Sequence, residues 1–366
     1  MAYFDASMDW IILVPPDEPH VKKAAGDLAR CIALLAGTSG GPARKEPVIM
    51  DALDPAPPGE SSCIVLNSDG NGPEQNGFTW RVGPSRVEIY GESGRGLCNG
   101  IYSFLSALGI IWPAPGQEKI PPPPVNTAPV SSCGFPLTIS SANEPSRTDG
   151  NDPAAVHWRR FVPAGEKTVK KILKKSGVFV EWAARRRYDA LVFPLRAFTS
   201  GPTGRKLKQL RQAAAEYGIS LEAGGRDLSS LVPRSCFLFH RDFFRMEEGR
   251  RKKAHHFCPT SPGTIRLIGK EGEKLFRAAG ESKIFHLWPD KGNETTWCSC
   301  PSCRAFTPQE QNRIAVNTAA DILAAINPEA SLVFYEKAGE SGITLRKNLC
   351  KMERLPSEKE FSGVEV

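Results

Sequence analysis

The sequence contains no long hydrophobic segment, which excludes a protein with membrane-spanning helices. No apolar run approaches the roughly 20 residues that such a helix needs. The N-terminus begins with acidic side chains and lacks the basic and apolar regions of a secretory signal. We therefore expect a soluble cytoplasmic protein with no membrane partner. Its 40% hydrophobic residues are enough for ordinary cores.

Motifs for several common functions are also absent. There is no P-loop, no Ser-His-Asp pattern and no helix-turn-helix or ribonucleoprotein signature. The net charge of +7 comes from clusters such as residues 185–187 and 250–253. Without interleaved aromatics these clusters indicate solvated helix faces, so no nucleic-acid partner is expected. An anionic small substrate, such as a uronic acid, suits the same charge.

The first 112 residues predict a small α/β sandwich domain. Apolar alternation and helical periodicity predict its elements at residues 9–14 (strand), 20–35 (helix), 62–67, 78–82 and 86–90 (strands) and 97–108 (helix). The Gly91–Gly96 run is interpreted as a tight turn into the last helix, because it does not follow the first strand of a long βαβ unit. No organic cofactor is expected. Residues 113–132 are proline-rich and predict an extended linker.

Residues 133–340 predict alternating strands and helices, which favours a parallel TIM-like (β/α) barrel. The strands are expected at 135–140, 189–194, 219–223, 283–288 and 330–335, and the helices at 167–187, 204–217, 262–279 and 309–326. Residues 341–366 form a charged tail without a convincing strand. Since about five of eight units are visible, the barrel is expected to be shortened, a fragment, or completed by a partner, which includes a second copy of the chain.

Two groups of motifs carry a resemblance to known families. The segment Gly91 to Gly109, followed by Trp112-Pro-Ala-Pro-Gly116, resembles the N-terminal domain of α-glucuronidases and hexosaminidase-type glycoside hydrolases. Further motifs follow the order seen in the bacterial domain of unknown function 4838, which resembles glycoside hydrolase barrels: Gly224-Gly-Arg-Asp-Leu, Phe239-His-Arg-Asp-Phe, Phe257-Cys-Pro-Thr-Ser-Pro262 and Trp288-Pro-Asp290. This chain departs from the family at Arg226, usually a histidine, and at Lys291, commonly an acidic residue.

Three carboxylates at predicted strand ends are the catalytic candidates. Glycoside hydrolysis generally needs one protonated and one ionised carboxylate. Asp290 is the first choice as acid or substrate-orienting residue, because it follows an apolar strand where barrels place active sites. Its alternative is a loop cap or an ion pair with an arginine. Glu222 and Glu336 are the other candidates at strand ends, with Asp227 slightly beyond. Glu222 and Glu336 each have a structural alternative, which for Glu222 is an ion pair with Arg196 or Arg226.

Aromatic and basic residues near these positions are the substrate-binding candidates. Trp288, Trp297 and His286 could stack on a sugar ring or contact it, although aromatics at strand ends are also ordinary core residues. Arg226 and Arg147 could hold a substrate carboxylate by paired hydrogen bonds, or serve in salt bridges within the barrel. The expected partner is therefore a saccharide, including a uronic-acid-containing one.

The cluster Cys298, Cys300 and Cys303 indicates a structural zinc site, with Cys258 as the expected fourth ligand. Reduced packing thiols and a redox pair are the alternatives. The sequence thus supports two functions. One is a glycoside-hydrolase-like enzyme that uses carboxylate acid/base chemistry, and the other is a non-catalytic or degenerate carbohydrate-binding relative with the zinc site.

Overall fold

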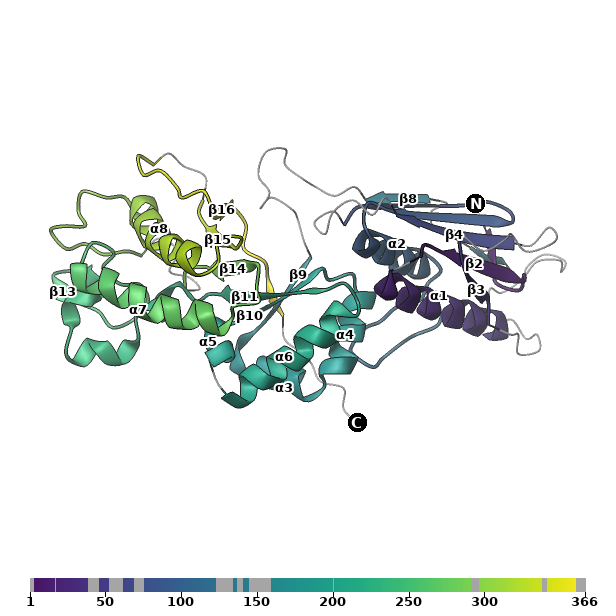
Figure 1. Cartoon of the computed structure of the whole chain (residues 1–366), viewed down its shortest axis with the longest axis horizontal. Helices are drawn as coiled ribbons and strands as arrows, with labels where there is room; N and C mark the ends of the chain where they lie inside the picture. The colour runs from purple at the N-terminus through teal and green to yellow at the C-terminus, as the bar shows by residue number, and fades with distance from the viewer. Residues whose placement is uncertain are drawn as a thin grey trace.

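The computed structural model describes residues 3–16, 18–38, 46–52, 62–68, 76–122, 134–136, 141–144, 159–199, 201–290, 296–337 and 341–359. Its N-terminal unit is a six-stranded sheet of order β3-β2-β4-β6-β5-β8 with two helices. The strands are β2 (Trp10–Val14), β3 (Val48–Asp51), β4 (Ser62–Ser68), β5 (Phe78–Val82), β6 (Arg86–Gly91) and β8 (Ser141–Glu144). Helices α1 (Pro19–Thr38) and α2 (Gly94–Ala107) cover one face, as Figure 1 shows.

The apolar stripe of α1 explains its place in this unit. Val21, Leu28 and Leu35 recur at helical spacing and are fully buried. At α2, the Ser93 hydroxyl accepts the Gly96 backbone N–H at 3.1 Å and caps the helix. A Cβ on Gly96 would lie 2.4 Å from the Gly77 carbonyl oxygen, so the glycine run is needed for this close turn.

The second unit is a seven-stranded parallel sheet of order β16-β15-β14-β11-β10-β9-β17. Its strands are β9 (Arg160–Pro163), β10 (Ala190–Phe193), β11 (Ser220–Gly225), β14 (Ile284–Leu287), β15 (Ser331–Tyr335), β16 (Leu349–Met352) and β17 (Glu358–Lys359). The helices are α3 (Gly165–Lys174), α4 (Ser176–Arg185), α5 (Leu195–Thr199), α6 (Gly201–Ala215), α7 (Pro262–Ala278) and α8 (Pro308–Ile326). The predicted α/β fold class, a small α/β unit before a partial parallel barrel, is confirmed.

Three predictions about elements are wrong. The segment expected as the first barrel strand pairs with the N-terminal unit instead: β7 (Gly134–Pro136) lies antiparallel to β1 (Tyr3–Asp5). β8 then joins β5, so the first barrel strand is β9. The helix predicted at 167–187 is interrupted at Lys175. The segment expected to lack strands contains β16 and β17.

The two units are joined by a buried polar network at the amino ends of the barrel strands. Asp189, directly before β10, accepts from Asn76 Nδ2 at 2.8 Å, Asn99 Nδ2 at 2.9 Å, Arg95 Nε at 3.4 Å and the Arg159 backbone N–H at 2.9 Å. One hydrophobic core also runs through both units. The N-terminal unit is therefore fastened to the end of the barrel opposite the carboxyl ends of its strands.

Candidate functional site

Three buried polar side chains from β9, β11 and β14 meet around Glu222 on the inner side of the parallel sheet. We call this side, which also carries Trp288, the concave side, and the three side chains the polar group. On β11, Glu222 Oε2 accepts from Arg160 Nε of β9 at 2.7 Å and lies 2.6 Å from His286 Nε2 of β14. All three side chains are at most 7% exposed. Gly224 has a φ of +120°, and a Cβ there would lie 2.0 Å from the His286 carbonyl oxygen. This glycine lets β11 approach β14 closely.

The charges of this group follow from its surroundings. Burial opposes ionisation of Glu222, but the Arg160 guanidinium outweighs it with the help of His286, and the pKa of Glu222 falls to about 2. Burial lowers the pKa of His286, so its ring is neutral at pH 7. Since ionised Glu222 can only accept, His286 Nε2 carries the hydrogen and Nδ1 is an acceptor. Glu222 is thus an ionised group and a poor proton donor.

Three buried polar atoms of this concave side lack a protein partner among the described residues. They are Glu222 Oε1, His286 Nδ1 and Trp288 Nε1. The Trp288 ring lies 4.9 Å from the His286 ring and packs with Val162 and Val192. Buried polar atoms usually have a hydrogen-bond partner. Two acceptors and one donor are therefore available to a bound polar molecule.

Asp290 lies in the loop directly after β14, as the sequence predicts. Its Oδ1 accepts from Ser229 Oγ at 2.7 Å, and its Oδ2 lies 3.7 Å from Arg234 Nη2 and 3.6 Å from His255 Nδ1. The carboxylate is 23% exposed, so it is accessible. Asp290 therefore also has the arginine partner, Arg234, that is expected from the sequence for its alternative role.

A second carboxyl group near Asp290 was noted from the sequence only as a candidate slightly beyond a strand end. Asp227 lies just beyond β11 and its Oδ2 accepts the Leu195 backbone N–H at 2.8 Å. Burial raises the pKa of Asp227 to about 6, against the effect of that hydrogen bond, and the charge of Asp290 adds to the rise. The only sequence signal was its position two residues after a buried strand.

The remaining predicted residues are distributed differently. Arg226 Nε donates to Glu358 at 2.9 Å and its Nη1 to the Pro289 carbonyl at 3.0 Å. The pairing of Glu222 with Arg226 or Arg196 is wrong, because Arg160 is the partner and Arg196 donates to the Ser230 carbonyl. Arg147 lies outside the described residues.

Glu336 and Trp297 are structural in their contacts. Both oxygens of Glu336 accept from Arg313 of α8, at 2.9 and 2.7 Å, and Glu336 is 3% exposed. Trp297 is 7% exposed and stacks on His256 with ring centroids 4.5 Å apart. Neither side chain belongs to the polar group around Glu222.

The four predicted cysteine ligands come together. Their Sγ atoms lie within 4.8 Å of one another, with Cys258 3.7 Å from Cys300 and 3.6 Å from Cys303. All four residues are buried. The Met246 backbone N–H donates to Cys298 Sγ at 3.2 Å, and Arg251 Nη1 lies 3.7 Å from the same atom. This buried group of four cysteines can bind a metal ion.

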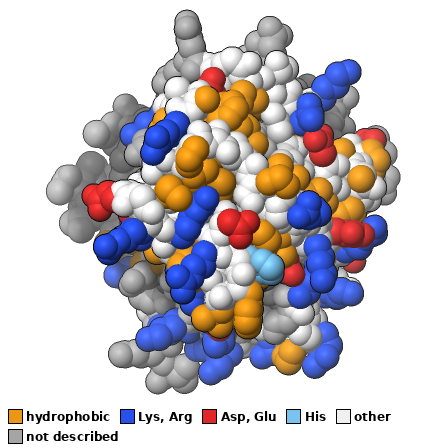
Figure 2. Space-filling view, turned by 90° about the vertical axis from the view of Figure 1, so that its left-hand side faces the viewer, with side chains coloured by type: hydrophobic (Ala, Val, Ile, Leu, Met, Phe, Trp, Pro, Cys, Tyr) orange, Lys and Arg blue, Asp and Glu red, His pale blue; other side chains and the backbone are white. Residues whose placement is uncertain are grey.

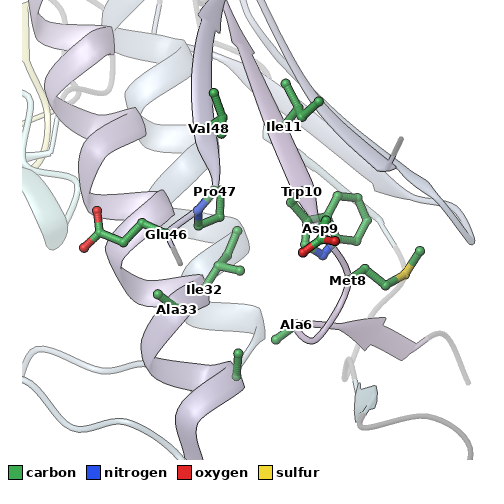
Figure 3. Close-up of a pocket in the computed structure, with 11 residues that line it drawn as sticks. Ala6, Met8, Asp9, Trp10, Ile11, Ile32, Ala33, Glu46, Pro47 and Val48 are labelled. Carbon is green, nitrogen blue, oxygen red and sulfur yellow. The ribbon is translucent and has the colours of Figure 1, made fainter. Parts of the chain in front are cut away.

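A cavity of about 290 Å³ lies elsewhere, in the N-terminal unit. Figure 3 shows Ile32 and Ala33 of α1 on one side, with Trp10 of β2 and Val48 of β3 opposite. Its lining is mostly apolar and includes no predicted site residue.

The surface at the α7 end of the molecule is rich in basic side chains. Figure 2 shows Lys and Arg side chains around patches of hydrophobic ones. Arg241, Arg250, Lys253 and Arg304 are among the exposed residues of the loops here. Within the described residues, no helix has the length and apolar character needed to cross a bilayer.

Comparison with known proteins supports the fold. No family model and no curated protein matches the chain. The structure is similar to a GH20 chitobiase from Flavobacterium johnsoniae, with 13% identity, a TM-score of 0.51 and coverage of 92% of this chain and 50% of that one. A β-N-acetylhexosaminidase from Bacteroides fragilis gives 16% identity, a TM-score of 0.49 and coverage of 96% and 66%. The chain thus spans about half the length of the chitobiase, and the likeness shows a glycoside-hydrolase-like fold.

Proposed function

We propose that this chain is a glycoside-hydrolase-like protein that acts on a saccharide at the carboxyl ends of β11 and β14. The observation that carries the proposal is Asp290, a partly exposed carboxylate at the end of a buried strand, close to a second carboxyl group, Asp227. Barrel enzymes place their chemistry at this end of the strands. The similarity of the fold to a chitobiase, and the sequence motifs of the family 4838, support the same proposal.

The two carboxyl groups suit different protonation roles. With a pKa of about 6, Asp227 holds a proton over a pH range in which an ordinary aspartate has lost it. Asp290 is hydrogen-bonded by Ser229 and faces the cations Arg234 and, when protonated, His255. Two carboxyl groups with different environments form the usual acid/base arrangement of glycosidases. We assign Asp290 as the orienting or acid/base group and Asp227 as its proton-sharing neighbour.

The concave polar group supplies contacts for sugar hydroxyls. Glu222 Oε1 and His286 Nδ1 are acceptors and Trp288 Nε1 is a donor, so a hydroxyl that both donates and accepts matches them. Arg226 and the basic surface at the α7 end favour an anionic saccharide such as a uronic-acid-containing one. The chemistry of these residues therefore suits a polyhydroxylated ligand.

The test is sugar release by the purified protein from a panel of aryl glycosides and uronic-acid oligosaccharides. We expect Asp290→Asn to lower release by about 100-fold or more and Asp227→Asn by about tenfold or more, as the loss of an acid/base group does. Asp242→Asn, an exposed aspartate in the same loops, is the matched control and should not change release. Equal release by all three variants would exclude both carboxyl groups from the reaction.

A second function, non-catalytic saccharide binding, is favoured by a specific observation. All three predicted catalytic carboxylates have an arginine partner, and two of them, Glu222 with Arg160 and Glu336 with Arg313, are buried and lie 2.7 Å from it. If this function is correct, saccharides from the panel stabilise the protein against heat without being cleaved. Stabilisation would then be lost in Trp288→Ala and kept in Asp290→Asn.

We further propose that the four cysteines hold a zinc ion that braces the loops near Asp290. Tetrahedral zinc with Zn–S bonds of about 2.3 Å places the sulfur atoms about 3.8 Å apart. The separations of Cys258 from Cys303 and Cys300, 3.6 and 3.7 Å, are close to this value, and Arg251 offsets part of the net negative charge of four thiolates and one zinc ion. When bound, zinc would supply structural cross-links between the loop of Cys258 and that of Cys298 to Cys303.

Metal content by mass spectrometry tests the zinc proposal. We expect one zinc ion per wild-type chain and none in Cys300→Ser. Cys236→Ser, a partly buried cysteine outside the cluster, is the matched control and should keep the metal. Wild-type protein without metal, in which all ten thiols react after unfolding, would support reduced packing thiols instead.

A further inference from the structure

The segment after β16, residues 353–359, crosses the carboxyl end of the barrel. β16 ends at Met352, and β17 pairs in parallel with Val162 and Pro163, the last residues of β9. Yet β16 and β17 lie at opposite edges of the sheet. The chain between them therefore spans the concave side without returning to the amino ends of the strands, and Figure 1 shows this yellow end of the chain beside β9. We call residues 353–359 the strap.

Side chains of the strap contact the candidate site. Leu355 packs with Val162, Val192 and Trp288, the apolar residues of the concave side. Glu358 accepts from Arg226 Nε at 2.9 Å, and the same arginine donates to the carbonyl of Pro289, the residue before Asp290. The strap thus covers the place where the saccharide is proposed to bind.

The strap is held by few interactions. β17 has two residues, and the Ala164 backbone N–H donates to the Lys359 carbonyl at 2.8 Å. The ion pair between Arg226 and Glu358 is partly exposed, at 22% and 28%, so water and salt weaken it. Beneath the strap lie the three buried polar atoms of Glu222, His286 and Trp288 that lack a partner in the described part of the chain. Segments with so few buried contacts open at low cost.

We propose that Arg226 is a carboxylate-binding subsite which Glu358 occupies in this structure, and that a carboxylate-bearing saccharide binds by displacing the strap. This inference rests on the proposed saccharide site. Exchange of one carboxylate for another leaves the guanidinium paired, with the geometry that arginine prefers. A neutral saccharide would displace Glu358 from Arg226 without supplying a carboxylate in its place, which costs free energy. The strap therefore selects acidic saccharides.

Binding to a matched pair of variants tests this inference. The probes are 4-nitrophenyl β-D-glucuronide and the neutral 4-nitrophenyl β-D-glucoside, measured by calorimetry. Glu358→Gln should bind the glucuronide about tenfold more tightly than wild type, as expected if the strap is closed in about nine molecules of ten. Glu353→Gln is the control, because Glu353 loses the same charge from the same strap but pairs with Lys351. Arg226→Gln should lose the preference for the glucuronide.

Hydrogen exchange provides the second readout. On saturation of the wild-type protein with the glucuronide, backbone amides of the strap and of Ala164 should exchange faster. Equal affinities of Glu358→Gln and Glu353→Gln for the glucuronide, a glucoside that Glu358→Gln binds as tightly as the glucuronide, or slower exchange of the strap would each overturn the inference. Glucuronide binding without sugar release would leave the inference standing and reject hydrolysis. Hydrolysis of neutral sugars by a protein whose strap exchanges no faster would support hydrolysis and reject the inference.

Discussion

The buried carboxylates at the two ends of the parallel sheet differ in how fully they are hydrogen-bonded. At the amino ends, both oxygens of Asp189 accept two hydrogen bonds each, and Arg95 from the N-terminal unit also donates to the Tyr188 and Tyr217 carbonyls. Toward the carboxyl ends, Glu222, His286 and Trp288 each keep a buried polar atom without a partner in the described chain. The first arrangement stabilises the fold, and the second would leave hydrogen bonds for the proposed saccharide.

The carboxyl groups repeat this difference. Asp189 is used to join two units, whereas burial raises the pKa of Asp227 and so makes its ionised form unfavourable. Functional sites commonly retain such unfavourable groups at a cost in stability. If the comparison is correct, substitutions at the amino ends should lower stability and leave the site intact. Substitutions at the carboxyl ends should change the site and lower stability less, or raise it.

The largest effect is expected for Asp189→Ala. It leaves the buried cation Arg95 and the amides of Asn76 and Asn99 without their acceptor, so the free energy of unfolding should fall by about 3–5 kcal/mol. Urea denaturation measures this change, with exposed Asp242→Ala as the control. Saccharide binding per folded molecule should be unchanged, and a loss of binding in the folded variant would break the comparison.

The next effect is the pH dependence that Glu222 gives to stability. Its pKa is lowered from 4.5 to about 2 in the folded protein, so the stabilisation is complete above about pH 4.5 and is lost as the pH falls toward 2. The shift corresponds to about 3 kcal/mol. Unfolding followed from pH 6 to pH 2 should show this loss in wild type and in the exposed Glu248→Gln control. If the stability of Glu222→Gln falls with pH as steeply as that of wild type, another group causes the loss.

A change of opposite sign is expected for Asp227→Asn. The folded state binds the Asp227 proton more tightly than the unfolded state, so stability falls as the pH rises from about 3.8 to about 6. The amide cannot ionise and still offers an oxygen to the Leu195 N–H. At pH 7 the variant should therefore be more stable by about 1–2 kcal/mol, after allowance for a weaker acceptor. Thermal unfolding at pH 4 and pH 7 checks this, and a less stable variant at pH 7 would assign Asp227 a structural role.

Much of the fold could be predicted from the sequence because its signals are local. The apolar runs at β10, β11, β14 and β15 and the helical stripe of α1 identify these elements. β16 and β17 escaped prediction because they sit at the edges of the sheet, where alternation is weak, and β17 has only two residues. The segment at 135–140, which overlaps β7, looks like the start of the barrel, and only the long-range pairing of β7 and β8 with N-terminal strands reveals their place.

The site was partly predictable for a similar reason. Asp290 follows from the end of an apolar strand, and the four cysteines from their spacing. The partner of Glu222 could not be foreseen, since Arg160 lies 62 positions away and meets it only through the curvature of the sheet. Asp227 was named only as a candidate slightly beyond a strand end, because the burial that raises its pKa cannot be seen in the sequence. The ion pairs and pKa values of these residues therefore depend on contacts between strands, which the spacing of residues in the sequence does not reveal.

The smallest effects are expected from a serine-to-alanine substitution at each end of the parallel sheet. Ser282, before β14, is buried, donates to the Leu221 carbonyl and accepts from Arg211, so Ser282→Ala should cost about 1 kcal/mol of stability without altering sugar release. Ser229 donates to the partly exposed Asp290, where water can replace it, so Ser229→Ala should cost less than about 0.5 kcal/mol. Because this hydroxyl orients Asp290, release should nevertheless fall by about tenfold. If both variants instead lose stability and sugar release to the same extent, the two ends of the sheet do not differ in their roles in stability and function.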